Sequence, residues 1–236
     1  MHFDWESLTD SVHRCRLPFL DVTVGLVQGT AGALLVDTGT TLTEAHAIDD
    51  DVRLIAGCAV THVVLTHKHF DHVLGSGGFA DAQIFCAPEV LDYLTTHISQ
   101  LRDDALSHGA DATEIDHAIA ALRAPQHAIR HAVVDLGNRE VTIAQPGAGH
   151  TDADLVISVP GATGERTVIF AGDLIEESGD PAIDSDSDVA AWPDTLDRLL
   201  AIGGPDAIYV PGHGSVVGPE FIRHQQDWLR QYRPRP

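Results

Sequence analysis

The feature that most constrains this chain is a polar cluster directly after the apolar run Val63-Val64-Leu65. Extended apolar residues that end in polar ones predict a buried strand delivering side chains to a loop at its tip. Imidazole nitrogens and carboxylates are the ligands that zinc and similar metals prefer, so the cluster predicts a metal site. The alternative is a solvated turn rich in histidine, which is disfavoured because four such residues rarely meet at one strand end by chance. The cluster consists of His67, His69, Asp71 and His72.

The spacing inside the cluster predicts how its members point. His67 and His69 lie two residues apart, and alternate residues of an extended backbone face the same side. Asp71 and His72 follow where the chain must turn, so we expect them to face a second point from the other side. The helical metalloprotease pattern HExxH is absent, because the cluster contains no glutamate.

Composition limits what the chain can be. Its 236 residues are 44% apolar, which suits one domain over residues 1–236 with a sizeable core. The net charge of −21 disfavours nucleic acid and anionic membranes as partners, and we expect a small-molecule substrate. Cys15, Cys58 and Cys86 lack CxxC spacing, which predicts reduced thiols in a cytoplasmic protein. We expect no signal peptide and no membrane-spanning segment.

Strands and helices are expected to alternate along the chain. A hairpin is predicted over Phe19–Val27 and Ala33–Val36, followed by a helix over Leu42–Ala56 that ends at Gly57. Glycines make any helix over residues 72–79 short or irregular. The tail, residues 233–236, should be loose. Further strands are predicted at 62–65, 83–87, 132–135, 141–145, 155–159, 167–171 and 207–210, and helices at 193–202 and 219–232.

The segment Pro88–Ala124 has helix-forming composition, with Gly109 as a break. It predicts two helices within a helical insertion, about residues 88–131, that lies over the active-site edge of the domain. The histidines scattered through the segment lack i,i+4 pairing and predict a solvated face. They are His97, His108, His117 and His127.

Three later strands each lead to a glycine followed by a candidate ligand. The ligands are His150 after Gly149, Asp173 after Gly172 and His213 after Gly212. Glycine lets a backbone turn sharply or approach closely. If these strands lie in two packed sheets, their tips can converge with the first cluster on one edge. The full candidate set is then His67, His69, Asp71, His72, His150, Asp173 and His213, which is enough for two metal ions.

Together these motifs resemble the metallo-β-lactamase superfamily, which has an HxHxDH signature followed by Gly-His, Gly-Asp and Gly-His elements in this order. The resemblance implies an α/β fold, an αββα four-layer sandwich with its site at one edge of the two sheets. It implies one metal on His67, His69 and His150, and a second on Asp71, His72 and His213. Asp173 would bridge the two ions and hold their separation, and Asp71 would orient a bridging hydroxide, so these two carboxylates are the expected catalytic residues.

The activity implied by the resemblance is that of a hydrolase with a dinuclear zinc centre, cleaving a small ester, thioester or lactone. Two Zn²⁺ ions are expected, with iron or manganese as alternatives. No Ser-His-Asp or Cys-His arrangement stands out that would supply a separate nucleophile.

Departures from the superfamily pattern separate its branches. Lactam-cleaving members generally lack the aspartate seen here as Asp173 or use a cysteine ligand, so β-lactam hydrolysis is an alternative only. The chain is more similar to the glyoxalase II-like and lactonase-like branches, although the segment after His213 is too short for a glutathione-binding domain. Two further alternatives are a mononuclear iron enzyme similar to persulfide dioxygenases and a non-catalytic metal-binding protein.

Several residues have two interpretations. Lys68 either points into solvent or holds a substrate carboxylate. Thr66, Thr151 and Asp152 either hydrogen-bond the imidazoles or make turn contacts. The acidic stretch 184–188 lacks the glycine and glutamate of an EF-hand, so an acidic loop is expected. The sequence leaves open the natural substrate, the metal in the cell and the oligomeric state, including a homodimer.

Overall fold

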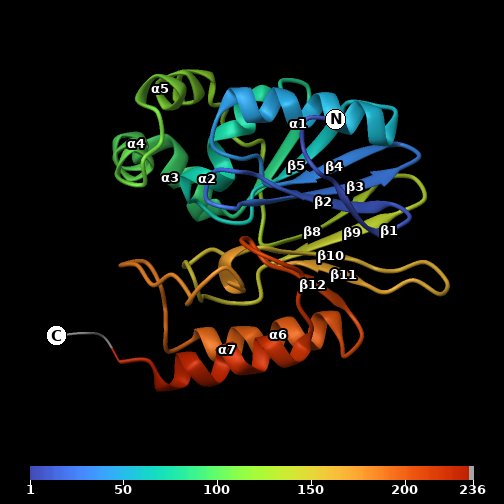
Figure 1. Cartoon of the computed structure of the whole chain (residues 1–236), viewed down its shortest axis with the longest axis vertical. Helices are drawn as coiled ribbons and strands as arrows, with labels where there is room; N and C mark the ends of the chain where they lie inside the picture. Colours follow the sequence, from blue (N-terminus) through green and yellow to red (C-terminus); the bar gives the residue numbers. More distant parts are fainter. Residues whose placement is uncertain (234–236) are drawn as a thin grey trace.

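Two β-sheets pack face to face between layers of helix in the computed structural model, which describes residues 1–233 (Figure 1). Helix α1 (Leu42–Ala56) covers the outer face of the first sheet, and helices α6 (Trp192–Gly203) and α7 (Pro219–Gln231) cover the second (Figure 1). The expected four-layer αββα sandwich is therefore confirmed. Of the tail expected to be loose, residues 234–236 lie outside the described part.

The first sheet has seven strands in sequential order. The first four run antiparallel, and β4 to β7 run parallel to one another. Sequence patterns missed β1, β2 and β7, because β7 has only two residues and β2 carries two arginines and a histidine. The strands are β1 (Glu6–Thr9), β2 (Val12–Arg16), β3 (Thr23–Gly29), β4 (Gly32–Val36), β5 (Val60–Val64), β6 (Gln83–Cys86) and β7 (His127–Ala128).

The second sheet has five strands in the order β12-β11-β10-β9-β8. All neighbours are antiparallel except β11 and β12, which are parallel. Each strand begins within one residue of its predicted start. The strands are β8 (His131–Asp135), β9 (Glu140–Ala144), β10 (Val156–Val159), β11 (Val168–Phe170) and β12 (Ile208–Val210).

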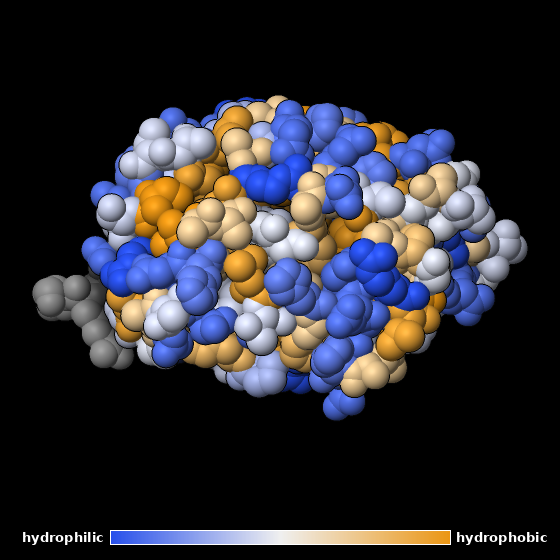
Figure 2. Space-filling model, turned by 90° about the horizontal axis from the view of Figure 1, so that it is seen from above, coloured by the Kyte–Doolittle hydropathy of each residue, from blue (hydrophilic) through white to orange (hydrophobic). Residues whose placement is uncertain are grey.

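Local chemistry sets the ends of α1. The hydroxyl of Thr41 accepts a hydrogen bond from the Glu44 backbone N–H, and the Glu44 carboxylate accepts one from the Thr41 N–H, a reciprocal capping box. The helix ends at Gly57, whose φ of +71° places it in the left-handed region that glycine adopts readily. Its inner face buries Ala45, Ile48 and other residues against the sheet. Viewed from above, the molecule shows hydrophilic and hydrophobic residues interspersed rather than one continuous apolar area (Figure 2).

The segment after β6 forms three helices, which corrects the expectation of two. They are α3 (Pro88–Thr96), α4 (Ile98–Ser107) and α5 (Ala112–Ala121). The additional break falls at His97, after Thr95 and Thr96, whose hydroxyls donate to carbonyls one turn back. Such bonds compete with the helical pattern near a helix end. The segment before it, α2 (Phe70–Val73) and a 3₁₀ helix over 74–78, is short as expected.

One large apolar core fills the space between the sheets and under α1, and a second lies between the five-stranded sheet and the helices α6 and α7. Trp192 is fully buried in the second core, which supports a packing role for its ring. No helix within residues 1–233 combines the length and apolarity needed to cross a bilayer.

Candidate metal centre

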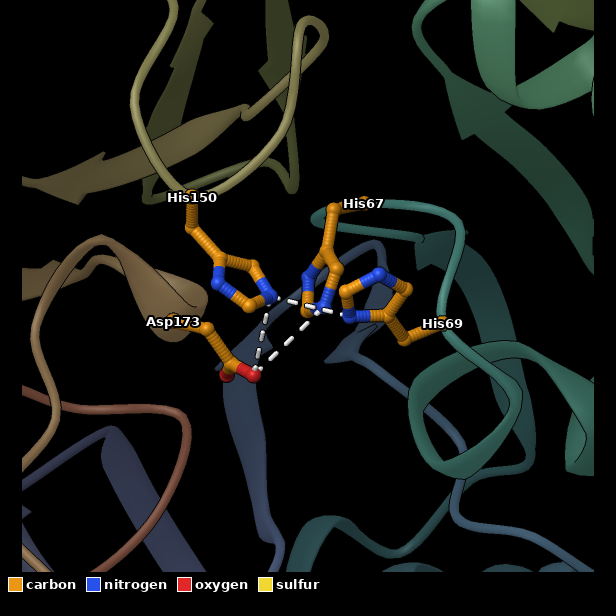
Figure 3. A group of neighbouring side chains, drawn as sticks. All are labelled: His67, His69, His150 and Asp173. Carbon is orange, nitrogen blue, oxygen red and sulfur yellow. Dashed lines mark hydrogen bonds and ion pairs between the residues drawn. The ribbon is translucent and has the colours of Figure 1, made fainter. Parts of the chain in front are cut away.

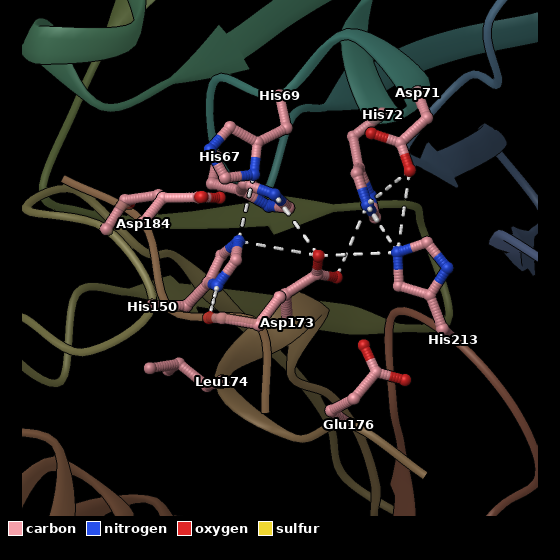
Figure 4. A network of polar contacts seen from close by, with 12 residues as sticks. His67, His69, Asp71, His72, His150, Asp173, Leu174, Glu176, Asp184 and His213 are labelled. Atoms are coloured by element: carbon pink, nitrogen blue, oxygen red, sulfur yellow. Dashed lines mark hydrogen bonds and ion pairs between the residues drawn. The ribbon is translucent and has the colours of Figure 1, made fainter. Parts of the chain in front are cut away.

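The ends of neighbouring strands bring the polar residues to one edge of the sandwich. Strands β4 and β5 are parallel, so the residues that follow them, Asp37 and Thr66, lie side by side at the same edge. In the second sheet, the loops after β9, β11 and β12 lead to His150, Asp173 and His213. The structure brings all seven predicted residues together at this edge (Figure 4).

The first group of donors consists of His67, His69, His150 and Asp173, whose ligand atoms lie within 4.8 Å of one another (Figure 3). Nδ1 of His69 is 2.9 Å from Nε2 of His150. Oδ2 of Asp173 lies 3.6 Å from Nε2 of His67 and 3.5 Å from Nε2 of His150. As the spacing predicted, His67 and His69 face one point.

The second group consists of Asp71, His72 and His213. Nε2 of His72 and Nε2 of His213 are 3.4 Å apart, and Oδ2 of Asp71 lies 3.6 Å and 3.5 Å from them (Figure 4). Oδ1 of Asp173 is 3.3 Å from Nε2 of His72, and its Oδ2 is 3.3 Å from Nε2 of His213. The Asp173 carboxylate therefore lies between both groups, as a bridging ligand must.

Hydrogen bonds on the outer side of the imidazoles orient two of them. The Asp37 carboxylate accepts from the Thr66 N–H and hydroxyl, each at 2.8 Å, and from Nδ1 of His72 at 2.9 Å. Because the Thr66 hydroxyl gives its proton to Asp37, it accepts from Nδ1 of His67 at 3.0 Å. Both rings then carry their proton on Nδ1 and turn the lone pair of Nε2 inwards.

Backbone carbonyls orient two further rings. Nδ1 of His150 donates to the Ala182 carbonyl at 3.2 Å, and Nδ1 of His213 donates to the Leu20 carbonyl at 2.7 Å. A carbonyl oxygen can only accept, so Nε2 of each neutral ring also presents a lone pair to the centre. Facing lone pairs cannot hydrogen-bond one another, and a cation between them resolves the repulsion.

Two buried atoms at the centre support the fit to metal ions. Nε2 of His67 and Oδ1 of Asp173 are buried without a hydrogen-bond partner among the described residues. Buried polar atoms normally have partners, since leaving them unpaired costs free energy. Inward lone pairs, two carboxylates and these orphaned atoms make a donor set that suits two borderline dications.

The ionisation of the cluster also reflects a demand for positive charge. Burial lowers the pKa of His150 to about 4 and holds the pKa of His67 well below its usual range. Burial alone would lower the pKa values of His213 and His72. The Asp173 carboxylate outweighs it, raising the pKa of His213 to about 10 and the pKa of His72 well above its usual range. Burial would raise the pKa of Asp173, but the neighbouring His72 and His213 hold this pKa well below its usual range. Metal ions would take the place of these protons.

The glycines before the later ligands have a steric reason. A Cβ on Gly212 would lie 1.8 Å from Oδ1 of Asp173, so only glycine lets the two loops approach. Gly172 has a φ of +52°, which turns the chain sharply after β11 and directs Asp173 to the centre.

A protein-family model described as the metallo-beta-lactamase superfamily matches residues 17–213. The chain belongs to this superfamily. Members of the superfamily are generally metal-dependent hydrolases, and the centre described above is of the kind that such enzymes need.

Relatives within the superfamily match different shares of the chain. Metallo-beta-lactamase type 2 of Bacteroides fragilis is 33% identical over 115 residues, 47% of this chain and 44% of that protein's length. Metallo-beta-lactamase domain-containing protein 1 of Xenopus laevis is 28% identical over 211 residues, 87% of this chain and 75% of that protein. The crystal structure of a metallo beta lactamase from Erythrobacter litoralis superposes with a TM-score of 0.73 at 19% identity, over 98% of this chain and 97% of that one. This last likeness supports the fold.

The structure decides between the two interpretations of the residues beside the superfamily motif. Thr151 donates to Asp154, and Asp152 accepts from Lys68, so neither contacts an imidazole of the cluster. Thr66 does, as expected. The partner that sequence patterns missed is Asp37. Its signal was its place at the end of a strand parallel to β5, where a carboxylate reaches Thr66 and Nδ1 of His72.

Lys68 follows neither of its two expected roles. Its side chain is only 13% exposed, and Nζ lies 3.3 Å from Oδ1 of Asp152 and 3.0 Å from Oδ2 of Asp186. Nζ also lies 5.3 Å from the centre of the Tyr93 ring. Lys68 therefore anchors the acidic loop 184–188 beside His69 instead of pointing into solvent or into the cleft.

An open cleft of about 210 Å³ leads to the centre. Besides the candidate ligands, Leu20, Phe70 and Glu176 line it, together with Asp104 of α4 and His108 just after that helix. His108 is exposed as expected but packs beside Phe70, with ring centres 5.4 Å apart. The C-terminal end of α4, the middle helix of the three, thus borders the cleft.

Proposed function

We propose that this chain is a dinuclear metal-dependent hydrolase that cleaves a small ester, thioester or lactone. The observation behind the proposal is a set of inward-facing donors in two groups that share Asp173. Two Zn²⁺ ions suit these nitrogen and oxygen donors, and iron or manganese would accept the same ligands. The first ion would be held by His67, His69 and His150, the second by Asp71, His72 and His213, with Asp173 between them.

Bound ions of this kind lower the pKa of coordinated water and polarise a scissile carbonyl. The residues of the chain supply the rest. Asp71 lines the cleft, so its carboxylate would accept a hydrogen bond from the attacking water and orient it. Asp37 and Thr66 keep the imidazoles from rotating. Leu20 and Phe70 would exclude bulk water from one side of the substrate.

Metal analysis combined with a substrate panel tests this function. We expect two zinc ions per chain after zinc loading, and turnover of at least one among an ester, a thioester and a lactone. Dialysis against a chelator should abolish turnover and zinc should restore it. Absence of bound metal with no gain on adding zinc, or a zinc-loaded protein inactive on the whole panel, would contradict the proposal. One iron per chain with oxygen uptake on a persulfide would favour the dioxygenase alternative.

A second candidate activity is hydrolysis of a β-lactam. The printed name of the Bacteroides fragilis relative, metallo-beta-lactamase type 2, favours it. Asp173 disfavours it, since lactam-cleaving members generally lack this aspartate. The cleft lining within residues 1–233 also contains no lysine or arginine that could bind the carboxylate of a β-lactam antibiotic. A chromogenic cephalosporin in the same panel decides between the two. The cytoplasmic location and the absence of a nucleic-acid partner stay predictions from composition.

A further inference from the structure

The cleft is acidic beyond the residues needed to hold metal. Three carboxylates outside the candidate ligand set line it, those of Asp104, Glu176 and Asp184. No lysine or arginine lies among its lining residues. Figure 4 shows Glu176 beside Asp173 and His213, and Asp184 on the opposite side next to His69. A substrate that reaches the centre therefore passes between negative side chains.

Glu176 is the most constrained of these three carboxylates. Its residue is 7% exposed, and its Oε1 accepts from the Ser178 N–H at 3.1 Å and from the Ser178 hydroxyl at 2.6 Å. Its Oε2 accepts no hydrogen bond from any residue within 1–233. Glu176 lines the cleft, so this free oxygen can accept a charge-assisted hydrogen bond from a positively charged group that arrives there.

Within residues 1–233, no lysine or arginine lines the cleft to meet an anionic substrate. Its only lysine is Lys68, which is already paired with Asp152 and Asp186. Asp184, by contrast, is exposed, and its carboxylate makes no hydrogen bond or ion pair with the described residues. The side chains that flank the centre at Glu176 and Asp184 are thus negative and have no lysine or arginine partner within residues 1–233.

Resting on the hydrolase function proposed above, we propose that the substrate carries a positively charged group, such as an ammonium, close to its scissile acyl carbon. Glu176 binds that group, and Asp184 adds to the attraction from the other side. Both carboxylates repel an acyl group that ends in a carboxylate. Glu176 is thus the specificity-determining residue of the site.

Three thioesters of one thiol test the proposal on the zinc-loaded protein. Their acyl groups, 3-aminopropanoyl, butanoyl and succinyl, have similar size and end in an ammonium, a methyl and a carboxylate. We expect kcat/KM for the 3-aminopropanoyl thioester to exceed that for the butanoyl thioester by about tenfold, which is the effect of one charge-assisted hydrogen bond. It should exceed kcat/KM for the succinyl thioester by a larger factor. Equal values, or a faster succinyl ester, would overturn the inference while leaving the hydrolase function intact. Failure to cleave all three would count against both.

Single substitutions test whether Glu176 causes the preference for the ammonium thioester. Glu176→Gln keeps an acceptor for Ser178 but removes the charge, so the tenfold preference for the ammonium over the neutral thioester should fall to near unity, and kcat/KM for the succinyl thioester should rise. Asp184→Asn changes an exposed side chain that makes no hydrogen bond within residues 1–233, so the fold should be kept, and the variant should lower the preference in part. Asp180→Asn removes an equal charge from an exposed position outside the cleft and should change nothing. A preference that survives both Glu176→Gln and Asp184→Asn would overturn the assignment.

Discussion

At the scale of single residues, Asp37 shows how the centre depends on a side chain that binds no metal itself. It has a φ of +60°, a left-handed conformation that costs free energy for a residue other than glycine. Its carboxylate accepts from both the Thr66 hydroxyl and Nδ1 of His72. The strained backbone is tolerated because it places one carboxylate between two residues that orient donors of both groups.

Asp37→Asn should weaken metal binding by about 10–100-fold, the usual cost of losing an outer hydrogen-bond partner of a ligand. The amide cannot accept from His72 and Thr66 as a carboxylate does, so the rings lose their orientation. Competition with a zinc-chelating dye measures the change in Kd. Asp135→Asn changes an exposed residue at the end of β8, far from the cluster in sequence; it is the matched control and should bind zinc as the parent does. Equal affinities for both variants would show that Asp37 plays no part in orienting ligands.

Asp173→Ala should remove the carboxylate shared by the two groups. We expect fewer than two zinc ions per chain and a loss of hydrolysis greater than the roughly 10–100-fold cost of an outer-sphere change. Elemental analysis and kcat/KM on the same preparation measure both. Asp180→Asn, which lies outside the cleft, should keep both values. Two tightly held ions in the Asp173→Ala variant would rule out its bridging role.

At the scale of elements, the loop over residues 182–188 is tied to Lys68 and to the turn that carries His150. Asp186 pairs with Lys68, the Ser187 hydroxyl donates to the His150 carbonyl at 2.7 Å, and the Asp188 N–H donates to the Gly149 carbonyl at 2.9 Å. The loop contributes Asp184 to the cleft and the Ala182 carbonyl to His150. Its position therefore affects both the mouth of the cleft and the orientation of one ligand.

Lys68→Met should loosen this loop without unfolding the domain. Methionine keeps much of the apolar stem but removes the ammonium partner of Asp186, which keeps only its 3.6 Å contact with Nε2 of His69, so the loop loses one of its ties. Amide hydrogen exchange over residues 183–188 should become several-fold faster, whereas exchange in α6 should not change. Unchanged exchange in the loop would mean that the ion pair contributes little, as exposed pairs often do.

At the scale of the whole molecule, the centre joins the two sheets. His67, His69, Asp71 and His72 follow β5 of the first sheet, whereas His150, Asp173 and His213 follow strands of the second. A pair of bound ions would cross-link the edge of the sandwich, and their removal would leave converging lone pairs and carboxylates uncompensated. Metal binding should therefore contribute to the stability of the fold.

Chelation should lower the melting temperature of the whole chain. A ligand at about 1,000 times its Kd stabilises the native state by about 4 kcal/mol, which corresponds to roughly 10 °C for a domain of this size. Thermal unfolding with zinc and with a chelator measures the shift. The Asp173→Ala variant should show a smaller one. Identical melting temperatures with and without zinc would show that the two sheets are not linked through the ions.

The sequence by itself determined the identity and order of the candidate ligands and most strands of both sheets. It could do so because these are local properties: the alternation of side chains in extended backbone, the apolar runs before each ligand, and glycines where chains turn or touch. The capping box at Thr41 and Glu44 likewise acts within one turn of helix.

Only the tertiary structure decided which residues support those ligands. The contacts of Asp37 with His72 and of Lys68 with Asp186 join positions far apart in the chain, and no local pattern encodes them. The same is true of the place of Glu176 in the cleft, and of β7, a strand of two residues that exists because β6 offers it an edge. Partners and pockets arise from the packing of separate elements, and the free energy that selects them appears only once the two sheets have come together.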